Sequence, residues 1–174
     1  MSKYYQIVIV GGGTAGITVA SRLLRKNQSL KGKIAIIDPA EYHYYQPLWT
    51  LVGAGASSLK SSRKDMKSVI PEGVQWIKNA VSSFQPENNS IILGDNSVVS
   101  YEFLVVAPGL QINWSSIKGL KENIGKNGVC SNYSPDYVRE TWRQISKFKQ
   151  GNAIFTHPNT PIKCGGAPMK IMYL

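Results

Sequence analysis

The segment that most constrains the fold of this chain is an apolar run that turns sharply into glycines, Val8 to Gly16 (VIVGGGTAG). Gly11, Gly13 and Gly16 stand in the spacing G-x-G-x-x-G. In such a segment the first glycine permits a tight turn, the second lets a pyrophosphate approach the backbone, and the third lets a helix pack closely on a strand. A plain strand-to-helix turn has similar glycines, so the flanking sequence must decide between the two interpretations.

The flanking sequence favours a dinucleotide site. Residues 5–10 form a β-branched run typical of a buried parallel strand. After Gly16, apolar residues recur at helical spacing and predict a helix. The N–H groups at the start of that helix would face the phosphates. A second buried strand, predicted at 33–37, ends in Asp38. A carboxylate there accepts hydrogen bonds from an adenosine ribose and repels a 2′-phosphate. The order of these elements predicts a Rossmann-like α/β domain that binds an ADP-containing dinucleotide and disfavours NADP.

Composition excludes several other classes. The chain has 174 residues, of which 43% are hydrophobic, enough for the core of one domain or one and a fraction. Its formal charge of +10 is dispersed, with one basic cluster at 60–67, which favours a solvated surface segment and does not indicate nucleic-acid binding. A basic field would still attract a small anion or an anionic bilayer. Cys130 and Cys164 have no metal-site spacing, so we predict no metal and a reducing compartment.

The two ends of the chain carry further expectations. Because the first strand begins almost at once, we expect no secretory or mitochondrial presequence. No apolar run approaches the length of a membrane span. Residues 169–174 have the pattern of the first turns of a helix without a stop signal. The sequence therefore predicts the amino-terminal part of a longer protein, or a short isoform of one.

An aromatic-rich loop over 39–49 is predicted at the carboxyl edge of the sheet, where its rings either wall a cofactor or pack beneath the loop. We assign no catalytic or metal-binding role to His43, which is isolated in this sequence. Small residues at 53–58 would let a phosphate or a ring approach the backbone.

Three more strands are predicted at 74–81, 90–93 and 98–106. They form a meander whose last, wholly apolar part belongs in the main sheet. The Pro108-Gly109 turn that follows would press the backbone of Gly109 against a cofactor.

Beyond a polar connection, the pattern predicts the start of a second nucleotide-type fold. Ser134-Pro135-Asp136 is typical of a helix start, and a strand is expected at 152–156. Residues 157–168, which contain Cys164, stand where a second glycine fingerprint would be. We therefore predict a FAD-type domain over 1–110, a connection over 111–133, and a connecting helix with the truncated start of a second domain over 134–174. The buried stripe of the connecting helix is expected at Val138, Trp142, Ile145 and Phe148.

Cys164 is the candidate nucleophile. Lys163 precedes it and a helix is predicted to start at Pro168, and both a cation and a helix N-terminus stabilise a thiolate and lower its pKa. The alternative is an inert buried thiol, since free cysteine commonly acts as a small hydrophobic residue. Cys130 is interpreted as inert.

Four stretches together resemble the eukaryotic-type sulfide:quinone oxidoreductases: residues 10–18, 45–55, 151–156 and 161–174. The resemblance runs through essentially the whole chain. It implies a flavoprotein of the two-dinucleotide-domain disulfide reductase type, in which FAD accepts electrons from hydrogen sulfide and passes them to ubiquinone. The oxidised sulfur then leaves to a small acceptor. The resemblance also implies a peripheral location on the mitochondrial inner membrane.

The same resemblance assigns individual residues. Cys164 matches one of two redox cysteines that together carry a persulfide. Thr14 and Ala15 match pyrophosphate contacts, Asp38 the ribose-binding acid, and Gln46 and Val81 further FAD contacts. The second redox cysteine, the later flavin segment and the quinone region lie beyond Leu174, so we expect this chain alone to be inactive.

Two other functions stay open at this point. A type II NADH dehydrogenase-like flavoprotein would share the first fingerprint, but it needs a second G-x-G-x-x-G, which does not follow Thr156. A truncated isoform that acts only through interactions would not retain a flavin.

Overall fold

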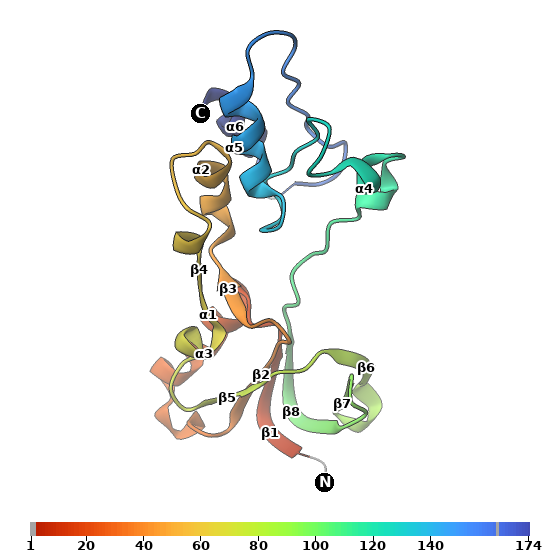
Figure 1. Cartoon of the computed structure of the whole chain (residues 1–174). Coiled ribbons are helices and arrows are strands. Elements are labelled where there is room, and N and C mark those ends of the chain that lie inside the picture. The colour runs from red at the N-terminus through yellow and green to blue at the C-terminus, as the bar shows by residue number, and fades with distance from the viewer. Residues whose placement is uncertain (1–2, 163) are drawn as a thin grey trace. The chain divides into compact units, whose positions relative to one another are not determined.

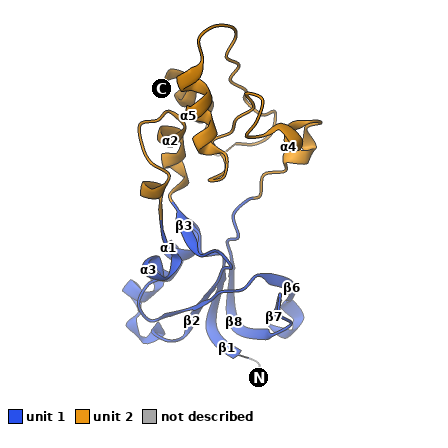
Figure 2. Ribbon diagram, viewed as in Figure 1, with its two compact units in different colours: residues 1–44, 64–110 blue, residues 45–63, 111–174 orange. Residues whose placement is uncertain are grey.

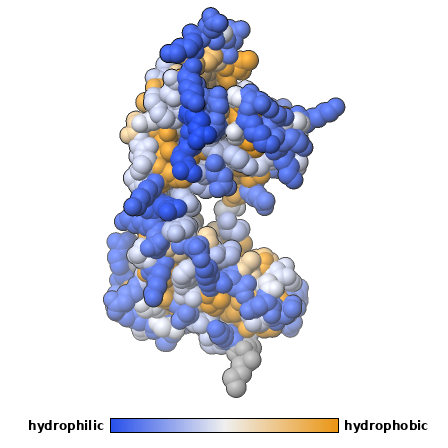
Figure 3. Space-filling model, viewed as in Figure 1, coloured by the Kyte–Doolittle hydropathy of each residue, from blue (hydrophilic) through white to orange (hydrophobic). Residues whose placement is uncertain are grey.

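The computed structural model describes residues 3–162 and 164–174 (Figure 1). It divides into two compact units, residues 1–44 with 64–110 and residues 45–63 with 111–174 (Figure 2). Hydrophobic side chains reach the surface of both units (Figure 3). Among the described residues, no helix combines the length and the apolar character needed to cross a bilayer.

The first unit is built on a six-stranded sheet with the order β5-β2-β1-β8-β7-β6. Strands β5, β2, β1 and β8 are parallel, whereas β8, β7 and β6 form an antiparallel meander. The predicted Rossmann-like fold class, a parallel sheet with a meander, is therefore confirmed. The strand bounds are Lys3–Val10 (β1), Ile34–Ile37 (β2), Val74–Ile77 (β5), Val81–Gln85 (β6), Ser90–Leu93 (β7) and Val98–Val106 (β8).

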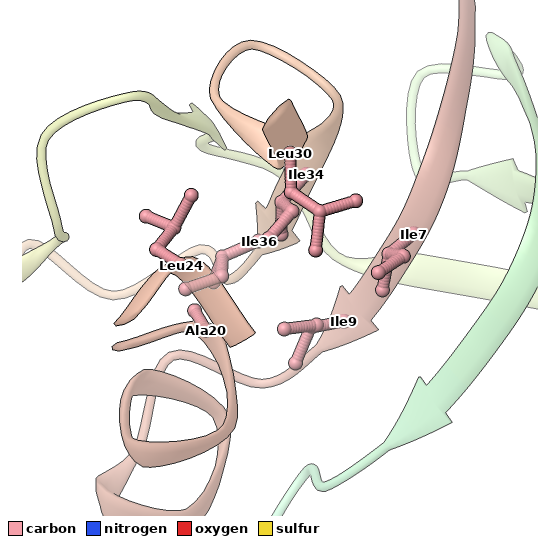
Figure 4. Packing of buried hydrophobic residues seen from close by; sticks show 7 residues of the cluster. All are labelled: Ile7, Ile9, Ala20, Leu24, Leu30, Ile34 and Ile36. Carbon is pink, nitrogen blue, oxygen red and sulfur yellow. The ribbon is translucent and has the colours of Figure 1, made fainter. Parts of the chain in front are cut away.

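Strand β1 buries side chains on both faces of the sheet, because side chains alternate along a strand. On one face, Ile7 and Ile9 of β1 pack with β2 and with helix α1 (Thr14–Lys26), whose Ala20 and Leu24 are buried. Figure 4 shows this cluster at close range. On the other face, Val8 and Val10 pack against residues of the meander. Helix α1 and the meander thus fix the position of β1 from opposite sides. The meander residues are Ile91, Leu93, Val99 and Tyr101.

The second unit consists of short helices and connecting segments. Helix α2 (Trp49–Gly53) packs against α5 (Val138–Lys147), where the Trp142 ring lies against Gly55. Helix α4 (Leu120–Asn123) interrupts the predicted polar connection, and α6 (Ala167–Tyr173) begins one residue before the predicted start. The first unit also contains β3 (Tyr42–Tyr44), which pairs with β4 (Arg63–Asp65) where the chain re-enters that unit, and α3 (Met66–Val69), which follows β4 in the chain.

The predicted strand at 74–81 is wrong in extent, because two strands occupy it. Residues 74–77 pair with β2 in the parallel part of the sheet, and residues 81–85 pair with β7 in the meander. Between them the Asn79 amide donates to the Ile77 carbonyl, which turns the chain out of the first strand. A local residue pattern does not report such a change of pairing partner.

The predicted strand at 152–156 is also absent from the structure. Those five residues have no strand assignment and are all exposed, with Ile154 at 82%. A strand needs a neighbour for its backbone groups, and the part of the chain that the structure describes offers none here. The residue pattern at 152–156 was therefore insufficient to predict a strand.

The predicted helix start at Ser134 lies one turn too early. Residues 134–137 form a turn in which the Ser134 hydroxyl accepts the Asp136 amide, and Tyr137 is the N-cap of α5. The predicted buried stripe is correct for Val138, which has no exposed surface, but Trp142 and Phe148 are 44% and 50% exposed.

Candidate functional site

The carboxyl ends of three strands meet at one edge of the first unit. The registers Val10↔Ile37 and Val10↔Val106 align the ends of β1, β2 and β8. The chain leaves β1 toward β2 on one side and later returns as β8 on the other side. The edge beside β1 is therefore a topological switch point, where ligands bind in open α/β sheets.

Gly11 and Gly16 make the turn after β1 possible. Gly11 has φ +104°, and a Cβ there would overlap the carbonyl oxygen of Ala107, which follows β8. A Cβ at Gly16 would in turn overlap the Gly11 carbonyl oxygen. Only glycine permits these two close approaches, which explains both positions of the fingerprint.

Gly13 opens toward solvent. It is the N-cap of α1 with φ −74°, and a Cβ there would meet no atom within 4 Å. Thr14 and Ala15 are exposed in the first helical turn, where no side chain caps the helix and no acid is present. The free N–H groups of the first turn carry a partial positive charge, so this open cradle fits the pyrophosphate of a dinucleotide.

Asp38 lies directly beside the glycine turn. Its Oδ2 accepts the Gly12 amide at 2.6 Å, and its Oδ1 accepts the Ala40 amide at 2.8 Å. The Trp76 indole Nε1 donates to the Asp38 backbone carbonyl at 2.9 Å and holds the residue at the end of β2. Each carboxylate oxygen can accept a second hydrogen bond, so the side chain keeps capacity for ribose hydroxyls.

Two other predicted cofactor residues belong to the same unit. Gly109 has φ +77°, is exposed, and stands two residues beyond the Ala107 carbonyl that contacts the glycine turn. Val81 begins β6 and is half-buried against the meander cluster. The structure thus brings Gly11, Gly16, Asp38 and the end of β8 together, with Gly13, Thr14 and Ala15 facing outward.

Gln46 and Cys164 belong to the second unit. Gln46 lies in a 3₁₀ turn, Gln46–Leu48. Cys164 is a free, exposed thiol, and its carbonyl accepts the Ala167 amide at the start of α6 at 3.2 Å. The part of the prediction that concerns Lys163 lies outside the described residues.

The small residues at 53–58 contact protein atoms at two of their positions. A Cβ at Gly53 would overlap the Asn132 side chain, and one at Gly55 would overlap the Trp142 ring. The aromatic loop is likewise packed at Trp49, which is buried and donates from Nε1 to the Ser62 hydroxyl at 3.2 Å. At these positions close packing accounts for the residue type.

Cys130 has the properties of an unreactive thiol. Its Sγ lies 3.7 Å from the Gly128 carbonyl oxygen and is half-buried. Burial raises the pKa of this thiol, the negative charge of Glu140 raises it further, and the Thr141 side chain partly opposes the shift. A raised pKa reduces the thiolate fraction at neutral pH, so Cys130 is a poor nucleophile.

Sequence reasoning missed His43 and Gly12. His43 Nδ1 lies 3.2 Å from the Gly12 carbonyl oxygen, although the two residues are 31 positions apart. Nothing in the local sequence connects a histidine between tyrosines with a glycine turn. The pairing depends on the path of the chain after β2, where β3 pairs with β4 in a separate two-stranded sheet.

Comparisons with known proteins agree with this architecture. Residues 5–137 match the pyridine nucleotide-disulphide oxidoreductase family. The chain belongs to this family. A similar fold occurs in the crystal structure of the sulfide:quinone oxidoreductase from the hyperthermophilic bacterium Aquifex aeolicus, with a TM-score of 0.68 and 21% identity over 84% of this chain and 32% of that one.

Curated relatives of this family member match over nearly its whole length. The mitochondrial sulfide:quinone oxidoreductase of Dictyostelium discoideum is 54% identical over 97% of this chain and 37% of its own length. The Mus musculus protein of the same name is 47% identical over 99% of this chain and 38% of its own length. The chain thus spans less than half the length of these relatives.

Proposed function

We propose that this chain is the amino-terminal part of a sulfide:quinone oxidoreductase, which oxidises hydrogen sulfide with FAD and passes the electrons to ubiquinone. The observation that carries the proposal is an exposed cysteine, Cys164, at the place in the chain where a second glycine fingerprint is expected. The identity of 47–54% to relatives that bear this name supports it.

In this proposal the first unit holds the adenosine and pyrophosphate of FAD. Gly13, Thr14 and Ala15 offer backbone N–H groups, Asp38 accepts from the ribose, and Gly109 lets the cofactor approach the backbone. Val81 and Gln46 are further proposed contacts. FAD, when bound, supplies a two-electron acceptor that can be reoxidised by a quinone. The domain limits at residues 110 and 133 are part of the same proposal.

Cys164 is proposed to form one half of a redox disulfide with a cysteine outside this chain. Hydrosulfide attacks the disulfide, a new S–S bond forms as the persulfide, and the second sulfur leaves as thiolate. A small thiol or other nucleophile then takes the outer sulfur of the persulfide, which leaves two cysteine thiolates. Re-forming the disulfide between them releases two electrons, for which FAD would be the first acceptor and ubiquinone the final one, reduced with two protons to the quinol.

Cys130 does not fit the role of the second sulfur. It is a free thiol in the same unit, half-buried, and its pKa is raised. A redox partner must be reached by sulfide and must leave as thiolate, and both requirements favour an exposed sulfur with a lowered pKa.

A type II NADH dehydrogenase-like activity is the alternative. It would need a nicotinamide site, and residues 157–168 carry prolines and Cys164 in place of the glycine spacing. Reduction of the bound flavin by NADH would favour this alternative. Mitochondrial location and peripheral association with the inner membrane are proposed from the names of the relatives and from the resemblance.

The test uses the full-length protein with its flavin, titrated anaerobically with sulfide while flavin absorbance is followed. We expect Cys164→Ser to lower the rate of flavin reduction by more than about a thousandfold, the scale on which removal of a nucleophile acts. Cys130→Ser is the matched control and should reduce normally. Unchanged reduction in Cys164→Ser would refute the proposed role.

A second test concerns the 174-residue chain alone. Because it supplies one reactive sulfur, we expect no sulfide-dependent reduction of a quinone analogue. Turnover by this chain would show that a second sulfur and the rest of the flavin site are not required.

A further inference from the structure

His43 has one possible role in its contact with the glycine turn. The Gly12 carbonyl oxygen can only accept a hydrogen bond, so the Nδ1 atom 3.2 Å away must carry the proton and donate it. His43 itself is half-buried in the centre of β3, a position that limits its rotation.

Gly12 is held on its other sides as well. Its amide donates to Asp38 Oδ2 at 2.6 Å. The space beside its Cα is filled by the Asp38 Cβ and the Met66 side chain, each 3.1 Å from the position that a Cβ would take. Both peptide groups of Gly12 are therefore fixed by side chains from outside the turn.

Because the peptide group is planar, holding the Gly12 carbonyl also fixes the direction of the Gly13 N–H group. The Gly12 carbonyl and the Gly13 N–H belong to one trans peptide, so they point in opposite directions. With the carbonyl held by His43, the Gly13 N–H points away from His43. Gly13 is also the residue of the turn that faces open space.

We propose that His43 is a positioning residue of the phosphate-binding turn, which aims the Gly13 N–H at a bound pyrophosphate by holding the Gly12 carbonyl. The inference rests on the proposed function only in requiring that this turn binds the pyrophosphate of a dinucleotide. It needs no assumption about sulfide, quinone or Cys164.

The test compares two substitutions of His43 in the full-length apoprotein. His43→Phe keeps a planar ring of similar size but cannot donate. His43→Asn places an amide Nδ2 near the position of Nδ1 and can donate. Dissociation constants are measured for FAD, for ADP, which contains the pyrophosphate, and for adenosine, which does not. His157→Phe is the matched control, because His157 is exposed and its Nδ1 lies 2.9 Å from the carbonyl oxygen of its own neighbour, Pro158.

We expect His43→Phe to weaken the binding of FAD and of ADP about tenfold, the scale of one lost hydrogen bond to a site group. The affinity for adenosine should stay unchanged. His43→Asn should recover most of that loss, and His157→Phe should bind like the wild type. Equal ADP affinity in His43→Phe and the wild type would overturn the inference. A parallel loss for adenosine would overturn it too, because the effect would not act through the phosphates.

Two measurements separate this inference from the proposed function. If the wild-type protein bound neither FAD nor ADP, the proposed function would fail and the inference with it. If the wild type bound both and His43→Phe were unaffected, only the inference would fail. A long-range ¹H–¹⁵N spectrum of the wild type should show a protonated Nδ1 on His43, and a neutral ring protonated at Nε2 would refute the contact even if the Phe variant did not fold.

Discussion

The two proposed sites, the glycine turn and Cys164, differ in how the backbone next to them is held. The glycine turn of the first unit emerges from β1, which is hydrogen-bonded on both sides, and β1 contributes four buried residues in succession, Ile7 to Val10. Cys164 of the second unit follows residues 151–161, all of which are exposed. Strand pairing therefore holds the backbone next to the first site, whereas no strand pairing holds residues 151–161 before Cys164.

One added methyl group at Gly16 has the largest expected effect on the glycine turn. In Gly16→Ala the new Cβ overlaps the Gly11 carbonyl oxygen, so the turn or α1 must shift. We expect the free energy of unfolding of the first unit to fall by at least about 4 kcal/mol, in the range of severe glycine and overpacking effects. Amide hydrogen exchange of β1 measures this loss.

Gly13→Ala is the matched control, because it adds the same methyl group three residues earlier. Gly13 has φ −74° and open space around it, so the change in stability should stay within about 1 kcal/mol. FAD affinity should fall, since the methyl group occupies space proposed for the pyrophosphate. Equal destabilisation by both variants would contradict the assigned geometry of the turn.

A second pair of variants compares a buried isoleucine of the first unit with an exposed isoleucine of the second unit. Ile36 on β2 has no exposed surface, whereas Ile154 is 82% exposed. Ile36→Ala should cost about 3 kcal/mol through lost burial and an unfilled cavity, and Ile154→Ala should cost less than about 0.5 kcal/mol. Chemical denaturation followed by amide exchange reports both values. A large effect of Ile154→Ala would mean that residues 152–156 pack in solution.

The sequence predicted the first unit well because its signals are local. The apolar run before Gly11, the periodicity after Gly16 and the acid at Asp38 each describe one element, and their order defines a Rossmann-like start. The strand predicted at 152–156 had the same kind of local signal. It failed because a strand also needs a neighbour, which no local pattern reports.

The candidate site divides in the same way. Gly11, Gly13, Gly16 and Asp38 were predicted from their spacing, and the structure shows why glycine is needed at Gly11 and Gly16. The contact between His43 and Gly12 could not be predicted, because it depends on the path of the chain between β2 and β3. Residues 74–77 pair with β2 and residues 81–85 pair with β7, and this change of pairing partner likewise has no local sequence signal.

The two thiols of the second unit differ in exposure and in expected reactivity. Cys164 is exposed, whereas Cys130 is half-buried and its pKa is raised by burial and by Glu140. A raised pKa leaves less thiolate at neutral pH, so iodoacetamide should alkylate Cys164 at least about ten times faster than Cys130. Peptide mass spectrometry of timed samples gives both rates, and Cys164→Ser isolates the rate of Cys130. Faster labelling of Cys130 would contradict this assignment.

The smallest expected effect concerns a surface ion pair of the first unit. Lys78 Nζ lies 2.6 Å from Glu41 Oε1, and this hydrogen bond with the attraction of the ammonium lowers the pKa of Glu41. A lowered pKa in the folded state contributes stability above the unfolded pKa, and that contribution is lost as the pH falls through the folded pKa. Glu41→Gln should therefore be slightly less stable than the wild type at pH 7, and the difference should disappear in acid.

Salt provides the independent control for the ion pair, since both side chains are largely exposed to solvent. At an ionic strength of about 1 M the Debye length is about 3 Å, so the difference between Glu41→Gln and the wild type should also vanish at pH 7. Thermal unfolding midpoints between pH 2 and 7, measured at low and high salt, test both dependences. If the difference in stability between Glu41→Gln and the wild type persisted in acid or in salt, Glu41 would act through packing and not through charge. The side chain would then be packed more closely than its exposure indicates.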